Sequence, residues 1–321
     1  MRFSTLSLAA TLLFTGLTAS AQTFNSPGEY NNFIVAEQRA MLKKNLRYIS
    51  KSAHSDNEKK IDSKRMELVK QTEQSLNKLA KMPAFKDDKG FKEQTTEAFY
   101  QLLKVYSEDY KAVDMLAGTR TATVENMEQY FRLQEVAEHK LQVINDSVDA
   151  AQQRFAKRHG MTIGEDPEGK RLAKYMQQVS EVNAYQHKVY LAQFRTEKAN
   201  AKLHDALQAQ DAAGFEAARQ QLLTDAKTAL AELAAVPAFR GKDGQYRDAA
   251  KALVTFYAGM CEKQFVQMQE LMTRKDQLSK SDVTTYNACI NQLNTGGQKF
   301  GEAYNRAGNA FMAAYVPVFN D

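Results

Sequence analysis

Two stretches of the sequence, 154 residues apart, carry nearly the same loop. LAKMPAFKDDKG occupies Leu79–Gly90, and LAAVPAFRGKDG occupies Leu233–Gly244. Between residues 76–90 and 230–244, seven of fifteen positions are identical, whereas a usage of about 7% per common residue type gives about one match by chance. The repeat predicts a chain made of two similar units of about 150 residues.

The hydrophobic pattern predicts that both units are all-α. Apolar residues recur every three or four positions over long stretches, which is the spacing of an amphipathic helix. The clearest run is Met127, Tyr130, Leu133, Ala137, Leu141, Ile144, Val148, Ala151 and Phe155. Alternation over the length of a strand is hard to find, and the chain has only five prolines in 321 residues, so little interrupts the helices.

Turn and breaker residues divide the mature chain into eight predicted helices. In the first unit, 22–158, they occupy 30–54, 58–82, 88–117 and 122–158. In the second unit, 170–321, they occupy 170–209, 211–236, 243–276 and 282–315. Residues 159–169, HGMTIGEDPEG, form the predicted linker. Each unit is expected to be an up-down four-helix bundle with short loops, packed with the other as one bundle or two.

The first 21 residues have the features of a cleaved secretory signal peptide. Arg2 is followed by the apolar run LSLAATLLFTGLT and by the small residues ASA at 19–21, which predict cleavage before Gln22. No later apolar run is long enough to cross a bilayer, which takes about 20 residues. We therefore expect an exported protein that is periplasmic, on the outer surface or secreted.

The repeated loop is either a duplicated joint or a duplicated ligand site, and its residues favour the joint. Pro83 and Pro237 end the second helix of each unit, because proline lacks an N–H and restricts the residue before it. Phe85 and Phe239 are expected to fold back and plug the end of each bundle.

The remaining residues of the loop have expected structural roles as well. Lys86 and Arg240 are expected beside the free carbonyls of the helix that has just ended, and Gly90 and Gly244 in backbone conformations that other residues avoid. Three acids are expected to cap the following helix: Asp87, Asp88 and Asp243.

Histidine is too scarce and too scattered to indicate a metal or haem site. The five are His54, His139, His159, His187 and His204. A di-iron bundle needs Glu-x-x-His on two helices, but Glu135 and His139 are four residues apart. No His-Glu-x-x-His, Cys-x-x-Cys-His or Gly-x-Ser-x-Gly motif occurs, and the aromatic stripes are expected to be core. The sequence thus predicts no catalytic residue, metal ligand or cofactor.

The last helix carries an unusual row of small residues. Gly297 and Gly301 are four apart, with Gly296 and Ala288 before them and Gly308 after. The simplest interpretation is the close approach of a neighbouring helix, and the alternative is a groove for a ligand or a partner helix. A phosphate loop is excluded, because no strand precedes the segment and the Gly-Lys-Ser/Thr ending is missing.

Cys261 and Cys289 could form a disulfide in an exported protein, but the predicted hairpin argues against it. Cys261 lies 15 residues before the end of its predicted helix, while Cys289 lies seven after the start of the next. At 1.5 Å per residue these positions differ by about 12 Å along the hairpin, more than the roughly 7 Å that a bridge spans between Cα atoms. We expect two free thiols.

Charge gives no sign of a nucleic-acid partner. The net charge is +5 and becomes +4 when Arg2 leaves with the signal peptide. The excess is spread along the chain, with no basic block among aromatics.

Three segments together resemble a known but uncharacterised family. They are EYNNFIVAEQ, LAELAAVPAFRGKDGQYRDAAKALVTFYAGM and LSKSDVTTYN. They are similar to a family of exported bacterial helical proteins, catalogued as a surface-protein family, named after a spirochaete member and widespread in Bacteroidetes. Arg247-Asp248-Ala249-Ala250 fits its pattern, whereas the first unit has EQTTEAFYQLL instead. The resemblance implies export and brings no catalytic residue or ligand.

Together these features predict an exported, non-enzymatic helical-bundle protein. Its expected role is a binding or structural component of the cell envelope or surface, acting through helix faces and grooves between the units on an envelope partner that the sequence does not identify. The alternative is a carrier of a small apolar or haem-like ligand in a bundle core, which a large cavity lined by Tyr and His would favour.

Overall fold

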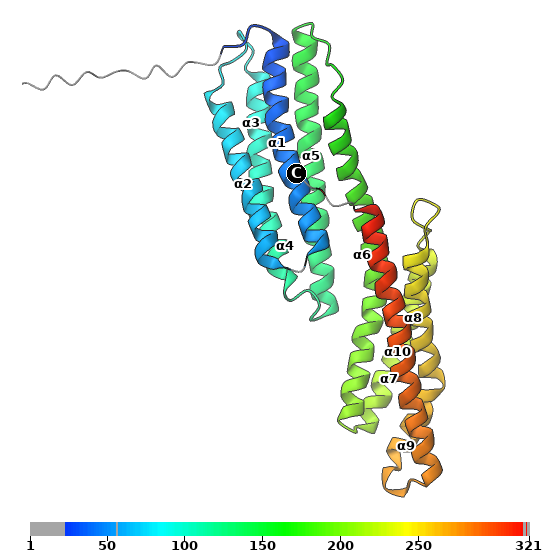
Figure 1. Ribbon diagram of the computed structural model, residues 1–321. Coiled ribbons are helices and arrows are strands. Elements are labelled where there is room, and N and C mark those ends of the chain that lie inside the picture. Colours follow the sequence, from blue (N-terminus) through cyan, green and yellow to red (C-terminus); the bar gives the residue numbers. More distant parts are fainter. Residues whose placement is uncertain (1–22, 56, 317–318, 320–321) are drawn as a thin grey trace, which may run out of the picture.

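The computed structural model describes residues 23–55, 57–316 and 319, and within these residues it consists of helices and has no strand (Figure 1). The all-α prediction is confirmed. The predicted signal peptide, residues 1–21, lies outside the described residues. In the described part of the chain, no helix is long and apolar enough to cross a membrane.

The first group of helices runs up and down with short turns. Its elements are α1 Pro27–His54, α2 Glu58–Lys81, α3 Gly90–Lys104, a π-helical segment Val105–Asp109, α4 Tyr110–Ala117 and α5 Val124–Arg158. Side-chain oxygens of Ser26, Asn57 and Thr123 accept backbone N–H groups at the starts of α1, α2 and α5, which replaces hydrogen bonds that a helix start lacks.

The second group repeats this order. Its elements are α6 Pro167–Gln208, α7 Ala212–Ala235, α8 Gln245–Glu262, α9 Gln264–Thr273, a short 3-10 turn Lys275–Gln277 and α10 Lys280–Tyr315. Asp211 caps α7, and Ser279 forms a capping box with Asp282 at the start of α10.

The third predicted helix of each group is interrupted, which corrects the continuous helices expected at 88–117 and 243–276. The π-helical segment Val105–Asp109 separates α3 from α4, and Lys263, at φ −129° and ψ −78°, separates α8 from α9. Neither break contains proline or glycine. Breaker residues were the only available signal, so the breaks could not be predicted, although they recur at similar places in both groups.

The repeated loop is a joint that buries an aromatic ring in each group. Phe85 is 4% exposed and Phe239 is 6% exposed. Phe85 packs against Tyr30 and Phe155, with ring centroids 5.4 and 5.7 Å away. Phe239 packs in the same way against Phe311, at 5.1 Å. The predicted plug is confirmed in both copies.

The left-handed backbone of the loop lies at different residues from those predicted. Lys86 has φ 52° and Arg240 has φ 50°. Gly90 instead begins α3, and Gly244 has φ −108°, so their predicted role is wrong. The turn between Phe239 and Asp243 is one residue longer than the turn between Phe85 and Asp88. It contains Gly241 at φ 71°, and a glycine accommodates this conformation.

Two later cations take the position predicted for Lys86 and Arg240. Lys92 donates to the carbonyl of Met82, and Arg247 Nη1 donates to the carbonyl of Val236 at 2.9 Å. They neutralise the ends of α2 and α7. Lys86 and Arg240 instead lie over the rings of their neighbouring phenylalanines, at 5.6 and 5.1 Å, because the left-handed turn directs them back across the plug.

Asp88 ties the first joint to the end of α5. It is 8% exposed, accepts the N–H of Gly90 at 2.9 Å, and pairs with His159 at 2.9 Å and Arg158 at 3.0 Å. Burial alone raises the pKa of Asp88, but the His159 hydrogen bond, the Gly90 N–H and the Arg158 charge outweigh burial and lower it below 3.8. Asp243 bonds the N–H of Gln245 in the same way, at 3.0 Å.

We expect Asp88→Asn to lower the free energy of unfolding by about 1.5–3 kcal/mol at pH 7, the usual value of hydrogen bonds to a charged group. A carboxyl with a lowered folded pKa stabilises the fold above its unfolded pKa of 3.8, and this stabilisation is lost as the pH falls through the folded pKa. The gap between wild type and variant, measured by urea unfolding, should therefore narrow below about pH 4. Exposed Asp87→Asn is the control, and a gap independent of pH would contradict the ionic role.

Helix α6 begins inside the predicted linker. Asp166 caps it by accepting the N–H of Gly169 at 3.0 Å, and Pro167 stands in its first turn, a position that suits proline. The connection after α5 is therefore 159–166, three residues shorter than predicted. Arg39 of α1 holds the same Asp166 at 2.6 Å, which fixes the start of α6 beside the middle of α1.

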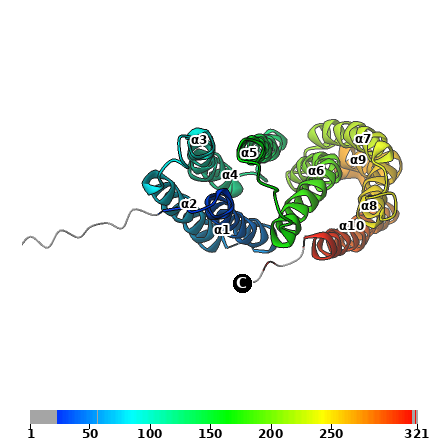
Figure 2. The ribbon, with the colours of Figure 1, turned by 90° about the horizontal axis from the view of Figure 1, so that it is seen from above.

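The two groups form two open arcs that meet at α6 (Figure 2). The second group is displaced along the helix axes, so that α6 runs alongside α5 first and alongside α7, α8 and α10 further down (Figure 1). Val179, Val182 and Val189 of α6 belong to the core shared with α7, α8 and α10. Helix α6 thus contributes to both groups.

The end of the described chain also joins the groups. His54 of α1 lies 2.6 Å from the carbonyl of Val316, and Ser50 accepts the N–H of Phe319 at 3.0 Å. Ile49 and Ala53 pack against the apolar core of the second group. The lower half of α1 is thereby attached to the end of α10.

Candidate binding cavity

The histidines do not gather into a metal site. No group of three or more His, Cys, Asp or Glu residues suited to a metal occurs in the described part of the chain. His54 and His159 make the contacts described above, and Glu135 bonds His187, at 3.4 Å, rather than His139. Burial lowers the pKa of His187 more than Glu135 raises it, and the ring stacks on Phe131 with centroids 3.8 Å apart. His187 is therefore neutral at pH 7 and part of the α5–α6 contact.

The small residues of α10 mostly serve helix packing. A Cβ at Gly296 would lie 2.3 Å from the ring of Phe256, and one at Gly308 would lie 3.1 Å from the ring of Tyr246. These glycines let α8 approach α10 closely, as the simpler interpretation predicted. Gly301 has nothing within 4 Å of such a Cβ.

Cys261 and Cys289 are free and buried in one apolar cluster of the second group, as expected. Burial raises the pKa of the Cys261 thiol to about 12 and also raises that of Cys289. Neither thiol is ionised at neutral pH, so neither is an activated nucleophile.

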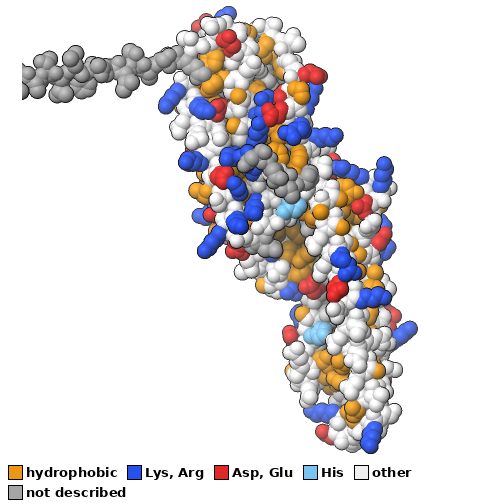
Figure 3. Space-filling view, viewed as in Figure 1, with side chains coloured by type: hydrophobic (Ala, Val, Ile, Leu, Met, Phe, Trp, Pro, Cys, Tyr) orange, Lys and Arg blue, Asp and Glu red, His pale blue; other side chains and the backbone are white. Residues whose placement is uncertain are grey.

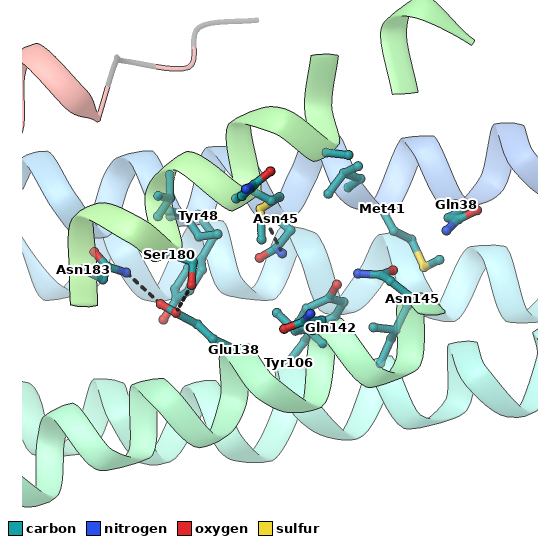
Figure 4. A pocket seen from close by; sticks show the side chains of 18 of the residues that line it. Gln38, Met41, Asn45, Tyr48, Tyr106, Glu138, Gln142, Asn145, Ser180 and Asn183 are labelled. Carbon is teal, nitrogen blue, oxygen red and sulfur yellow. Dashed lines mark hydrogen bonds between the residues drawn. The ribbon is translucent and has the colours of Figure 1, made fainter. Parts of the chain in front are cut away.

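A large cavity opens between α1, α5 and α6, where the first arc of helices stays open. At one end α1 and α5 meet through Tyr30 and Phe155, whose rings stack at 5.3 Å, and through Gln152, which donates to Asn31 at 2.9 Å. Beyond that contact the space between them measures about 1360 Å³, more than the roughly 300–1,000 Å³ typical of small-ligand sites. Figure 4 shows side chains of all three helices around it.

Tyrosine rings line the inner end of the cavity. Tyr48 and Tyr110 stack with centroids 4.7 Å apart, and Tyr106 lies 5.5 Å from Tyr110. The hydroxyl of Tyr48 donates to Asp114 at 2.9 Å and that of Tyr110 to Asn45 at 3.1 Å. Burial raises the pKa of all three, so they stay protonated at neutral pH. The three side chains are only 3–6% exposed and belong to the apolar core of the first group, so they form a rigid base beneath the cavity.

The hydroxyl of Tyr106 differs from the other two. The side chain is 3% exposed and lines the cavity, as Figure 4 shows. Among the described residues no group accepts or donates a hydrogen bond at this hydroxyl. This oxygen is not among the fully buried unpaired side-chain atoms, so it reaches the space of the cavity and offers a hydrogen bond that the fold leaves unused.

Amide side chains cover much of the remaining wall. Twelve Asn and Gln residues line the cavity. On α1 they recur every seven residues, at Asn31, Gln38 and Asn45. On α5 they include Gln142 and Asn145, which Figure 4 shows beside Tyr106. An amide both donates and accepts hydrogen bonds. The cavity wall can therefore bind a neutral ligand that carries both hydrogen-bond donors and acceptors.

Glu138 joins α5 to α6 at one side of the cavity. Its carboxylate accepts the hydroxyl of Ser180 at 3.0 Å and the amide of Asn183 at 2.7 Å (Figure 4). Burial raises the pKa of Glu138 more than these two donors lower it. These two hydrogen bonds link α5 to α6 beside the cavity.

The cations that line the cavity already have partners. Arg39 pairs with Asp166 at 2.6 Å, and Lys170 pairs with Glu165 at 3.0 Å. Arg120 lies over the ring of Tyr130 at 5.3 Å and donates to the carbonyl of Ala117. Over the face in Figure 3, Lys and Arg alternate with Asp and Glu rather than forming a block of one sign.

Neither sequence nor structure comparison adds a relative: the chain matches no protein-family model, no curated protein and no solved structure. The resemblance to an exported surface-protein family therefore stays a prediction.

The sequence alone did not predict the cavity, although it carried a signal. The heptad spacing of Asn31, Gln38 and Asn45 places polar groups along one face of α1. Such a row beside an apolar stripe is also typical of a solvated helix face. A cavity wall and a solvated helix face can be told apart only from the structure, in which α1 and α5 stay apart.

Proposed function

We propose that this protein is an exported, non-enzymatic binding protein of the cell envelope that holds its ligand in the cavity between α1, α5 and α6. The observation that carries the proposal is the cavity itself, which is large and is lined by fixed tyrosine rings and amides. A cavity of this kind with convergent polar groups is the usual form of a ligand site. Export rests on the predicted signal peptide, residues 1–21.

The alternative of a carrier for an apolar or haem-like ligand has less support from the lining. The cavity has the size and the tyrosines of a carrier, but an apolar ligand would remove the unpaired amides of Gln38, Gln142 and Asn145 from water without replacing their hydrogen bonds, which is unfavourable. His187 is stacked on Phe131 and is poorly placed as an axial haem ligand. A polar ligand fits the same cavity better.

Photo-cross-linking in intact cells tests the proposal without knowledge of the ligand. A benzophenone amino acid at Gln142, inside the cavity, is expected to capture a bound molecule that mass spectrometry detects as an adduct. The same amino acid at Gln129, an exposed residue of α5 outside the cavity lining, is the matched control. Equal or absent adduct at the two positions would contradict the proposal.

A further inference from the structure

The lining of the cavity contains more amide side chains than charged ones, and the charged ones are of both signs. Its amides each bring a donor and an acceptor, and Gln38, Gln142 and Asn145 make no hydrogen bond to other described residues. The hydroxyl of Tyr106 is also free. A ligand that fits must supply many donors and acceptors together.

The tyrosines form a rigid base beneath these polar groups. Tyr48, Tyr106 and Tyr110 form one aromatic cluster, with neighbouring centroids at 4.7 and 5.5 Å. The hydroxyls of Tyr48 and Tyr110 are held by Asp114 and Asn45, so their rings keep their orientation. Because the three side chains are only 3–6% exposed, recognition of a ligand depends on the polar groups above them.

Most charges of the lining are already paired, which disfavours ionic ligands. Arg39 and Lys170 are paired with carboxylates, and Arg120 donates to the carbonyl of Ala117 and lies over Tyr130. The carboxylate of Glu138 is held by Ser180 and Asn183, which leaves it poorly placed to bind an amine. Asp146 and Asp149 are exposed, where water and salt screen them.

We infer that the cavity binds a neutral, hydroxyl-rich ligand of the oligosaccharide class, whose hydroxyls bond to Gln38, Asn145 and the hydroxyl of Tyr106. This inference rests on the proposed function and names the ligand class for the same cavity. A hydroxyl group, like an amide, donates and accepts, so the two sets match without ion pairs. The volume of about 1360 Å³ has room for more than one sugar ring.

The test titrates the purified full chain with short neutral oligosaccharides of glucose and of N-acetylglucosamine, with spermidine and palmitate as probes of the competing classes. Isothermal titration calorimetry gives the affinity. Tyrosine fluorescence, from a chain with 14 Tyr and no Trp, is a second measure of binding. We expect at least one oligosaccharide to bind with a Kd in the micromolar range, roughly 1–100 μM, and to change the tyrosine signal. Spermidine and palmitate are expected to bind at least tenfold more weakly.

Two variants connect binding with the named groups. Tyr106→Phe removes only a hydroxyl that the fold does not use, so it should leave the melting temperature unchanged and weaken binding about tenfold, the effect of about one lost hydrogen bond. Gln38→Leu should act similarly, whereas Gln129→Leu, outside the lining, should bind as wild type does. Unchanged binding in both cavity variants would overturn the assignment.

The outcomes separate this inference from the proposed function. Failure of every oligosaccharide to bind, or tighter binding of spermidine or palmitate, would overturn the ligand class. Capture of another molecule at Gln142 in cells would still support the cavity as a binding site. Absence of capture at Gln142 would instead remove the proposed function and this inference together.

Discussion

Replacing Asp114 by alanine is expected to lower the free energy of unfolding by about 3 kcal/mol, because it leaves a buried cation without its main partner. Arg65 of α2 has a side chain only 7% exposed, and its Nε donates to Asp114 of α4 at 3.0 Å. Tyr48 donates to the other oxygen of Asp114 at 2.9 Å. The substitution removes both hydrogen bonds and leaves Arg65 with the exposed carboxylate of Asp62.

Urea unfolding followed by circular dichroism measures this loss, and Asp62→Ala is the control. Asp62 also contacts Arg65, but its side chain is 55% exposed, and exposed ion pairs contribute about 0–1 kcal/mol. A loss at Asp114 no larger than that at Asp62 would show that Arg65 does not depend on α4.

Replacing Phe85 or Phe239 by alanine is expected to cost about 3–5 kcal/mol in each case, the range for removing a buried phenylalanine. Both rings are nearly inaccessible to water and contact other aromatic rings. Phe85 closes the first group against Tyr30 and Phe155, and Phe239 closes the second against Phe311 and Tyr315. The free energy of unfolding should fall because each substitution leaves a cavity at a bundle end.

Differential scanning calorimetry tests this prediction together with the role of the loop. Phe85→Leu and Phe239→Leu keep most of the apolar volume and should cost less than the alanine variants. Ligand capture at Gln142 should be unchanged at temperatures where the variants remain folded. Unchanged melting together with lost capture would show that the repeated loop is a ligand site rather than a joint.

The sequence predicted the helices well because their signals are local. The 3.6-residue spacing through Leu141, Ile144 and Val148 needs only one element to be recognised, and all three residues are buried. The breaks at Val105–Asp109 and Lys263 had no local signal, because a π-helical turn needs no proline or glycine. The left-handed residues were missed for a related reason: Lys86 and Arg240 adopt this conformation although neither is a glycine.

The cavity lay beyond prediction because it depends on distances between helices. Asn31, Gln38 and Asn45 have the same spacing whether water or a ligand covers them. That α1 and α5 meet at Tyr30 and Phe155 and then leave a cavity between them follows from packing of the whole first group, which no single segment specifies. The same holds for Tyr106, whose free hydroxyl is defined only by the absence of a neighbouring partner among the described residues.

Helix α6 is continuous, and it belongs to the wall of the cavity and to the second group of helices. Its 42 residues, at 1.5 Å per residue, span about 63 Å. Its first half faces the cavity through Met176 and Asn183, and its second half packs against α7 and α8. A substitution that shifts the axis of α6 would therefore act on the cavity wall and on the core of the second group together.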